Sequence, residues 1–319
     1  MSRQIANPTG IKKGGYPMDS TEQRRFEPLL EKMQQCLVLQ GLSDKTIEAY
    51  ARALRRLAAF FDRCPDQLTT DDLKSYFAQL VKTHSWSTVK VDRCGIQFFY
   101  RHVLNTSWDW VSIVKPPVVR SLPDILTREE TFKVINTTRK LRYRIFFLTT
   151  YSMGLRLGEA LRLEVGDIDG QRLRVHVRCA KGCKDRFVPL PEVTLLALRR
   201  FWTTHRNPRL LFPNRLGSSC RIRNAEGHMD RGGVQTAIKA AVADSGIRRK
   251  ITMHSLRHSY ATHLLELGVD LREIQSILGH ARPETTARYA QLTDITANNA
   301  TEKLRVMMSS FCLSWADEP

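Results

Sequence analysis

The sequence predicts a mainly α-helical protein with a small β-sheet, divided between two domains. Helical periodicity of apolar residues fills most of the stretch 21–105. Strand-like alternation occurs in two short runs, 172–177 and 186–190, which a tight loop connects. A proline-containing linker at 111–123 lies between these regions, and 319 residues are enough for two hydrophobic cores. We therefore expect a helical bundle followed by an α+β domain.

The composition points to a polyanionic partner. The formal net charge is +18 and the isoelectric point is about 9.9, which favours nucleic acid first and an acidic membrane surface second. The sequence has no run of roughly 18 apolar residues, and residues 1–20 lack the apolar core of a secretory signal, so we expect no membrane segment and no export. Scattered cysteines without a second zinc-spaced pair indicate reduced thiols, a cytoplasmic location, and no bound metal or cofactor.

Four helices with short connections are expected in the first domain, residues 21–110, which follows a flexible tail at 1–20. Gly41 ends the first helix, Ser43 can cap the second, and acidic residues in the first turn favour a third helix from Thr70. Basic residues of the second and fourth helices and of the linker are candidate contacts to a phosphate backbone, although a solvated surface charge is the commoner explanation for any single one. These candidates are Arg52, Arg55, Arg56, Lys90, Arg93, Lys115 and Arg120.

The second domain is expected at 124–293, with a C-terminal tail at 294–319. Its first helix begins with the pattern of a capping box, with Thr127 at the N-cap and Glu130 three residues later. A strongly apolar helix follows, and residues 167–170 are expected to form a turn before the β-hairpin. Amphipathic helices then continue toward the C-terminus.

Charged side chains stand among apolar neighbours in this second domain. Arg156 and Glu159 are three residues apart, as are His254 and Arg257, so each pair shares one helical face. An arginine keeps its charge and offers a fork of donors suited to phosphate, while a histidine can exchange a proton near neutral pH. The hairpin loop presents Lys181, which could reach a neighbouring site, although a lysine in a turn is more often simply solvated.

Other interpretations fit the same residues. A lone His-x-x-Arg is most often a surface pair on a helix, and an isolated Arg–Glu pair is most often structural. His254, His258 and His263 could form a zinc cluster, because histidines at i and i+4 have a zinc spacing, but the glutamate of a His-Glu-x-x-His motif is absent. Residues 266–280 could be an ordinary helix-turn-helix that turns at Gly268.

The order of the motifs is more informative than any one of them. A Gly-Leu-Arg-x-x-Glu box, a lysine in a hairpin that ends Arg-Phe-Val-Pro-Leu, a His-x-x-Arg box, a Leu-Gly-His box and a tyrosine follow one another. This series resembles the tyrosine recombinase (phage integrase) family, near its Xer and integron-integrase branches. The stretch 207–231 looks too short for the extra segment of integron integrases, which favours a Xer-like, phage or mobile-element enzyme. The residues that carry the resemblance are Arg156, Glu159, Lys181, His254, Arg257, His280 and Tyr289.

The resemblance implies an N-terminal core-binding domain and a catalytic domain that together form a site-specific recombinase. Such an enzyme cuts and rejoins DNA through a 3′-phosphotyrosyl intermediate and a Holliday junction, without metal, cofactor or ATP. Tyr289 would be the nucleophile, and Arg156 and Arg257 would hold the phosphate as charge develops on it. Lys181 would protonate the leaving 5′-oxygen.

The remaining roles and partners are also implied by the resemblance. His254 and His280 would bond the phosphate and help to move the Tyr289 proton, with Glu159 in support. The partners would be double-stranded recombination sites and further copies of the chain, which would be a monomer when free and a tetramer in the synapse. The two domains would clamp DNA in a C shape, residues 294–319 would pass to a neighbouring protomer, and the enzyme would act at the bacterial nucleoid. A catalytically idle DNA-binding relative, a type IB topoisomerase and a zinc hydrolase are the alternatives.

Overall fold

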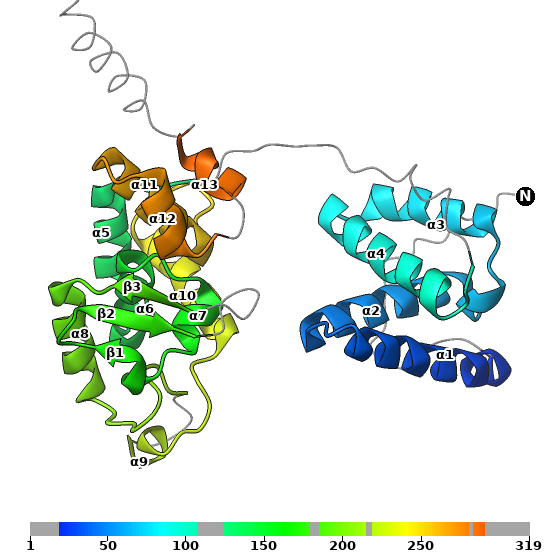
Figure 1. Ribbon diagram of the computed structural model, residues 1–319, viewed down its shortest axis with the longest axis horizontal. Coiled ribbons are helices and arrows are strands. Elements are labelled where there is room, and N and C mark those ends of the chain that lie inside the picture. Colours follow the sequence, from blue (N-terminus) through cyan, green and yellow to red (C-terminus); the bar gives the residue numbers. More distant parts are fainter. Residues whose placement is uncertain (1–18, 107–123, 179–184, 215–218, 281–282, 291–319) are drawn as a thin grey trace, which may run out of the picture. The chain divides into compact units, whose positions relative to one another are not determined.

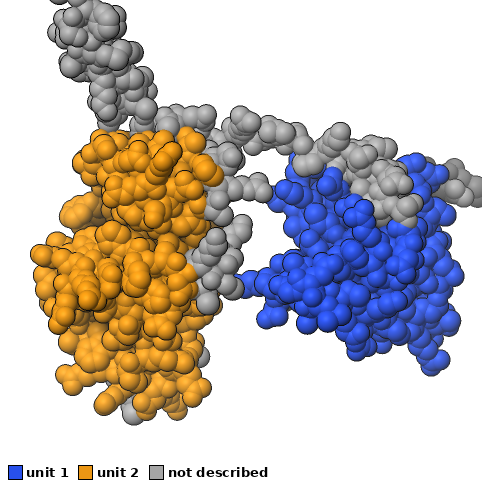
Figure 2. Space-filling view, in the orientation of Figure 1, with its two compact units in different colours: residues 1–119 blue, residues 120–319 orange. Residues whose placement is uncertain are grey.

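The computed structural model describes five stretches of the chain (Figure 1), namely residues 19–106, 124–178, 185–214, 219–280 and 283–290. The chain forms two compact units, residues 1–119 and 120–319, which Figure 2 shows in different colours. The expected tails, the linker with Lys115 and Arg120, and the loop with Lys181 lie outside the described residues. Within the described part, no helix is both long enough and apolar enough to cross a membrane.

The first unit contains the four expected helices. Gly41 adopts a left-handed conformation (φ 68°) between the first two, and Thr69 and Asp72 form a reciprocal capping box at the start of the third. Ser43 is the N-cap residue of the second helix, but its hydroxyl bonds the side chain of Thr46 instead of a backbone amide. The helices are α1 (Ser20–Leu39), α2 (Asp44–Phe61), α3 (Thr70–Thr83) and α4 (Trp86–His102), with a short 3-10 helix η1 (Pro65–Gln67) after α2.

The core of this unit lies between α2 and α4, whose backbones approach closely. A Cβ atom on Gly95 would lie 3.0 Å from the Tyr50 Cα, so a larger residue there would push the two helices apart. The buried Asp92 of α4 accepts hydrogen bonds from Arg56 Nη1 of α2 (2.6 Å) and from the Tyr76 hydroxyl of α3 (2.9 Å). This network joins three helices and engages the charge of Arg56 within the unit.

The second unit combines one antiparallel sheet with nine helices among its described residues. The helices are α5 (Arg128–Thr137), α6 (Leu141–Ser152), α7 (Leu157–Leu161), α8 (Glu192–Trp202), α9 (Ser219–Arg223), α10 (Arg231–Asp244), α11 (Met253–Glu266), α12 (Leu271–Leu278) and α13 (Pro283–Ala290). The strands are β1 (Ile168–Asp169), β2 (Arg174–Val177) and β3 (Arg186–Pro189), in the order β1-β2-β3, after a 3-10 helix η3 (Val165–Asp167).

The sheet confirms the predicted hairpin and adds one strand to it. Val175 of β2 pairs with Val188 of β3, and both side chains are buried. The stretch 167–170 is only partly the turn that we expected, because Ile168 pairs with Val175 on the other side of β2. A two-residue strand at the edge of a sheet is too short to show a period of two in the sequence.

Two glycines bring the ends of α6 and α12 toward the same place. Gly154 follows α6 with φ 58°, and a Cβ atom there would lie only 2.5 Å from the Tyr260 ring. Gly279 caps α12 with φ 63°, and a Cβ atom there would lie 3.0 Å from the Cδ of Arg186. Both positions therefore require glycine for conformation and for space. The predicted capping box of Thr127 and Glu130 is confirmed at the start of α5.

Candidate active site

Arg156 and Glu159 form a closed unit at the N-terminus of α7. Glu159 Oε2 accepts a hydrogen bond from the backbone N–H of Arg156 (2.9 Å), as a carboxylate at the third helical position can. Glu159 Oε1 accepts a second bond from Arg156 Nη1 at 2.7 Å. The spacing of the Gly-Leu-Arg-x-x-Glu box thus fixes the arginine and the carboxylate relative to each other.

Arg257 of α11 is the largest fully buried side chain of the described residues, with 1% of its surface exposed. Its Nη1 donates to the Gly154 carbonyl (2.7 Å) and its Nη2 to the Leu278 carbonyl (2.6 Å). Its Nε is buried and has no hydrogen-bond partner within the described part of the chain. Burial, reinforced by Arg156, lowers the pKa of Arg257 to about 9, so this guanidinium is still charged at neutral pH.

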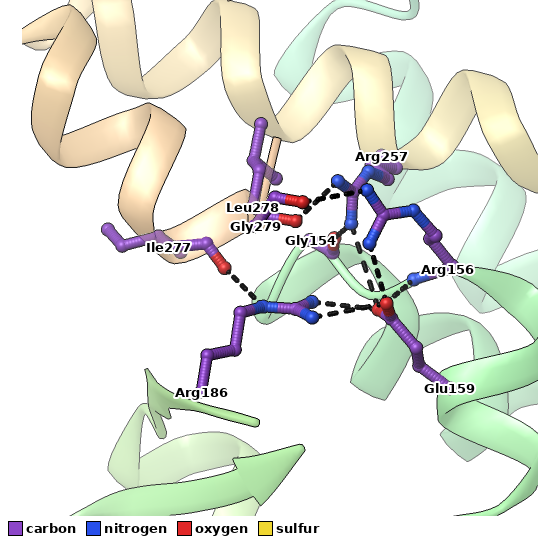
Figure 3. Close-up of polar contacts among 8 residues, drawn as sticks. All are labelled: Gly154, Arg156, Glu159, Arg186, Arg257, Ile277, Leu278 and Gly279. Carbon is purple, nitrogen blue, oxygen red and sulfur yellow. Dashed lines mark hydrogen bonds and ion pairs between the residues drawn. The ribbon is translucent and has the colours of Figure 1, made fainter. Parts of the chain in front are cut away.

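A third arginine completes the cluster (Figure 3). Arg186, the first residue of β3, donates from Nη1 and Nη2 to the two oxygens of Glu159, at 3.1 and 2.7 Å. Its Nε donates to the Ile277 carbonyl at 2.8 Å, and Arg156 Nη2 donates to the Gly279 carbonyl at 3.0 Å. The carbonyls at the C-terminal end of α12, which lack partners within the helix, are therefore satisfied by arginines.

The charges of this cluster do not balance. Burial opposes ionisation of Glu159, but hydrogen bonds from Arg186 and Arg156 outweigh it and lower the pKa of Glu159 to about 2. The carboxylate is therefore ionised and faces three guanidinium groups, those of Arg156, Arg186 and Arg257. Buried charge without compensation is costly. The site consequently favours a bound anion, and the planar donor forks suit a phosphate group.

Tyr289, on α13, is near enough to Arg257 to interact with its charge, and 1% of the Tyr289 surface is exposed. Its hydroxyl shares a hydrogen bond of 2.9 Å with Nδ1 of His258 on α11. The ring of His280 is stacked on the Tyr289 ring at a centroid distance of 6.2 Å. The ring of His254, one turn before His258, meets the His258 ring edge-on, with 4.4 Å between the ring centroids.

Two histidines of the site, His280 and His254, have lowered pKa values that favour the neutral form. Burial, followed by Arg257 and Arg156, lowers the pKa of His280 to about 3. Partial burial and the same two arginines also lower the pKa of His254. His280 Nδ1 shares a hydrogen bond of 2.9 Å with the Thr286 hydroxyl, which links the end of α12 to α13. A neutral imidazole can accept a proton, so these rings are suited to proton transfer.

The structure brings most of the predicted site residues together. Arg156, Glu159 and Arg257 are joined directly by hydrogen bonds and ion pairs, and His280 and Tyr289 stack beside them. His254 joins them through the ring of His258. Lys181 belongs to the loop between β2 and β3, outside the described residues, so its position in the site stays a prediction.

Sequence reasoning assigned no role in the site to Arg186 and His258. Arg186 begins the Arg-Phe-Val-Pro-Leu end of the predicted hairpin, which was part of the resemblance but gave this arginine no role of its own. His258 lies one helical turn after His254, and this spacing was the only signal that it shares the helical face of His254 and Arg257.

The zinc alternative is not supported by the histidines themselves. His263 has other partners than His254 and His258. Its Nδ1 is hydrogen-bonded to the Tyr151 hydroxyl (2.8 Å) and its Nε2 to the Leu126 carbonyl (2.9 Å). In the described stretches, no group of three or more His, Cys, Asp or Glu side chains is arranged to hold a metal ion.

The candidate DNA contacts of the first unit differ in their surroundings. Arg52 and Lys90 are exposed on α2 and α4, and Arg93 is partly buried. Arg55 forms a loose ion pair with Glu48 at 3.4 Å. Arg56 is engaged by Asp92, as described above. The role of all four helical arginines and of Lys90 in DNA binding stays a prediction.

Comparison with known proteins identifies the class to which this fold and site belong. Residues 124–295 match the phage integrase family, and residues 29–110 match the N-terminal SAM-like domain of phage integrases. The chain belongs to the phage integrase family. It is a site-specific tyrosine recombinase, an enzyme that cleaves and rejoins DNA.

Individual relatives extend over most of the chain. The tyrosine recombinase XerA of Pyrococcus horikoshii is 30% identical over 282 residues, which cover 88% of this chain and 94% of the relative. XerD of Oceanobacillus iheyensis is 31% identical over 269 residues, 79% of this chain and 89% of the relative. A lambda integrase dimer bound to a COC′ core site has a similar fold, with a TM-score of 0.67 at 16% identity over 82% of this chain and 94% of that one.

Proposed function

We propose that the site binds one phosphate of a DNA strand between Arg156 and Arg257, and that the Tyr289 hydroxyl attacks it. The bond from Tyr289 Oη to phosphorus forms as the bond to the 5′-oxygen breaks, which gives a 3′-phosphotyrosyl ester and a free 5′-hydroxyl. Attack of a 5′-hydroxyl on this ester restores the DNA and the tyrosine, so that strand exchange through a Holliday junction needs no ATP. The observation that carries this proposal is the buried excess of positive charge beside Tyr289.

Preorganised arginines would supply the electrostatic part of catalysis. Arg156 and Arg257 are already held by fixed carbonyls and by Glu159 before any phosphate binds. Donors that are fixed in advance need not reorient as negative charge develops on the phosphate oxygens, which is usually the largest catalytic contribution. Glu159 would support Arg156 without touching the substrate.

Proton transfer would involve the histidines and Lys181. His258 lies at hydrogen-bond distance from the Tyr289 hydroxyl and would accept its proton as the oxygen attacks. His280 and His254 would bond the phosphate oxygens from the neighbouring face. Lys181 would donate a proton to the leaving 5′-oxygen, as the family resemblance implies.

We further propose that the partners are double-stranded recombination sites and other copies of this chain. The related XerH and lambda integrase structures contain recombination-site DNA, and the lambda integrase is a dimer there. The bundle (21–110) and the catalytic domain (124–293) would form a C-shaped clamp around DNA. A monomer in the free state would assemble into a tetramer in the synapse, with residues 294–319 passed to a neighbour. A bacterial nucleoid is the expected location.

The test begins with the DNA that the enzyme attacks. Incubation with genomic fragments, denaturation, and sequencing of DNA that stays covalently attached to protein would identify the cleaved site. We expect Tyr289→Phe to abolish this covalent adduct and to leave DNA affinity within about twofold, because the substitution removes only the nucleophilic oxygen. Tyr143→Phe is the matched control, since Tyr143 is a buried tyrosine of α6 in the same unit. An adduct with the Tyr289 variant would refute the assignment of the nucleophile.

A further inference from the structure

Arg186 is a buried charge of the active site to which the reaction described above gives no task. We propose that Arg186 is a positioning residue that holds Glu159 and the C-terminal end of α12 in place, and thereby aligns the two phosphate-binding arginines. This inference rests on the proposed function, because it concerns the geometry of the same site. It gives a role to a residue that takes no part in the reaction steps proposed above.

The first support is the way in which Arg186 immobilises Glu159. Oε1 of Glu159 accepts from the Nη1 atoms of both Arg156 and Arg186, at 2.7 and 3.1 Å. Oε2 accepts from the backbone N–H of Arg156 and from Arg186 Nη2, at 2.9 and 2.7 Å. A carboxylate with two donors on each oxygen has one orientation left. Without Arg186, the carboxylate could rotate, and Arg156 would rotate with it.

The second support is the bond from Arg186 to α12. Its Nε donates to the Ile277 carbonyl, and the next two carbonyls, those of Leu278 and Gly279, accept from Arg257 and Arg156. Figure 3 shows the three guanidinium groups converging on Glu159 and on this helix end. Arg186 therefore fixes a partner of each phosphate-binding arginine at the same time.

The third support is the burial of Arg186. Only 10% of its side chain is exposed, compared with 26% for Arg156. Its stem lies against Gly279, where a Cβ atom would approach its Cδ to 3.0 Å. All three of its nitrogen atoms donate to Glu159 or Ile277, whereas Nε of Arg257 has no partner among the described residues. The Arg186 donors point at Glu159 and α12, so its effect on the reaction passes through them.

The geometry demands the arginine fork and not only a positive charge. A lysine keeps the charge, but its single ammonium group cannot reproduce two parallel bonds to Glu159 and a third to Ile277. Loss of a group that orients a functional residue typically costs 10- to 100-fold in activity, by analogy with the outer shell of metal sites. We expect Arg186→Lys to slow cleavage by about 10- to 100-fold and to leave DNA affinity within about twofold.

The experiment is single-turnover cleavage of a nicked substrate by the full-length chain, with the rate taken from the adduct-forming fraction alone. Misfolded molecules lower the amplitude of the adduct but not its rate, so a purely structural effect is separated from positioning. Arg174→Lys is the matched control: Arg174 lies on the neighbouring strand, bonds Asp169 at 3.2 Å and stacks on Phe187. We expect this control to cleave at the wild-type rate.

A double-mutant comparison shows whether Arg186 acts on the cleavage rate through Glu159 or independently of it. If Arg186 acts through Glu159, Arg186→Lys should slow cleavage much less in a Glu159→Gln background than in the wild type. Equal fold losses of the cleavage rate in the two backgrounds would overturn the inference.

The outcomes also separate this inference from the proposed function. An adduct with Tyr289→Phe would refute the proposed function whatever Arg186 does. Loss of the adduct with Tyr289→Phe, combined with a wild-type rate in Arg186→Lys, would leave the proposed function standing and refute the positioning role.

Discussion

Replacing Glu159 by glutamine should destabilise the second unit as well as the site. The carboxylate has a pKa of about 2 in the folded chain, against an ordinary value of 4.5, because its hydrogen bonds with Arg186 and Arg156 outweigh the effect of burial. Each pKa unit corresponds to about 1.4 kcal/mol, so the ionised carboxylate contributes roughly 3 kcal/mol to the free energy of unfolding at neutral pH. Glu159→Gln removes this contribution and leaves three arginines without a negative partner.

The pH dependence of this loss follows from the sign of the pKa shift. A lowered carboxyl pKa stabilises the fold fully above the unfolded value, and the stabilisation declines as the pH falls toward the folded value. The difference between wild type and Glu159→Gln should therefore be constant from pH 6 to 8. It should be roughly 1 kcal/mol smaller near pH 3.5–4, because the unfolded wild type then binds a proton that the folded form does not.

The stability of this unit can be measured by urea unfolding of the full chain, with hydrogen exchange of the buried α6 amides as the probe. Glu130→Gln is a suitable control, because Glu130 also pairs with an arginine but is 30% exposed, and such pairs contribute at most about 1 kcal/mol. A loss below about 1 kcal/mol for Glu159→Gln, or one that does not change with pH, would show that the Glu159 cluster is not the stabilising feature that its contacts indicate.

Three further results are expected. His258→Ala should slow Tyr289 attack by about 100-fold, and added imidazole should restore part of the rate; absence of rescue would show that His258 does not take the proton. Lys181→Ala should be rescued by a bridging 5′-phosphorothiolate, whose sulfur leaves without a proton, and failure of rescue would exclude Lys181 as the general acid. Truncation after Thr293 should preserve binding of one DNA site and abolish cooperative binding and recombination; a recombining truncated chain would refute exchange of the tail.

The motif residues could be predicted because their chemistry is local. Arg156 and Glu159 are three residues apart, and the same short segment forms their hydrogen bonds. Residues of α11 likewise share a face by helical geometry alone. For these positions, spacing in the sequence is nearly equivalent to spacing in the structure.

Arg186 could not be recognised in this way, because its importance depends on contacts across the fold. It meets Ile277, 91 residues later, and Glu159, 27 residues earlier. In the sequence it is one basic residue at the start of a strand. Arg56 illustrates the same limit in the first unit: its pattern indicated a surface charge, but Asp92, 36 residues later, engages it from within the bundle.

The burial of Tyr289 bears on how DNA would enter the site. Tyr289 and Arg257 are each 1% exposed, so we infer that α13 must move before a phosphate can reach the proposed nucleophile. The Tyr289 ring packs in a small apolar cluster with Ala261, Ile274 and Leu278, separate from the main core of the unit. Uncovering one aromatic side chain would cost about 2–3 kcal/mol, which corresponds to an open form of roughly one molecule in a hundred. DNA that binds this form more tightly can shift the population, and the excess positive charge beneath Tyr289 supplies that preference.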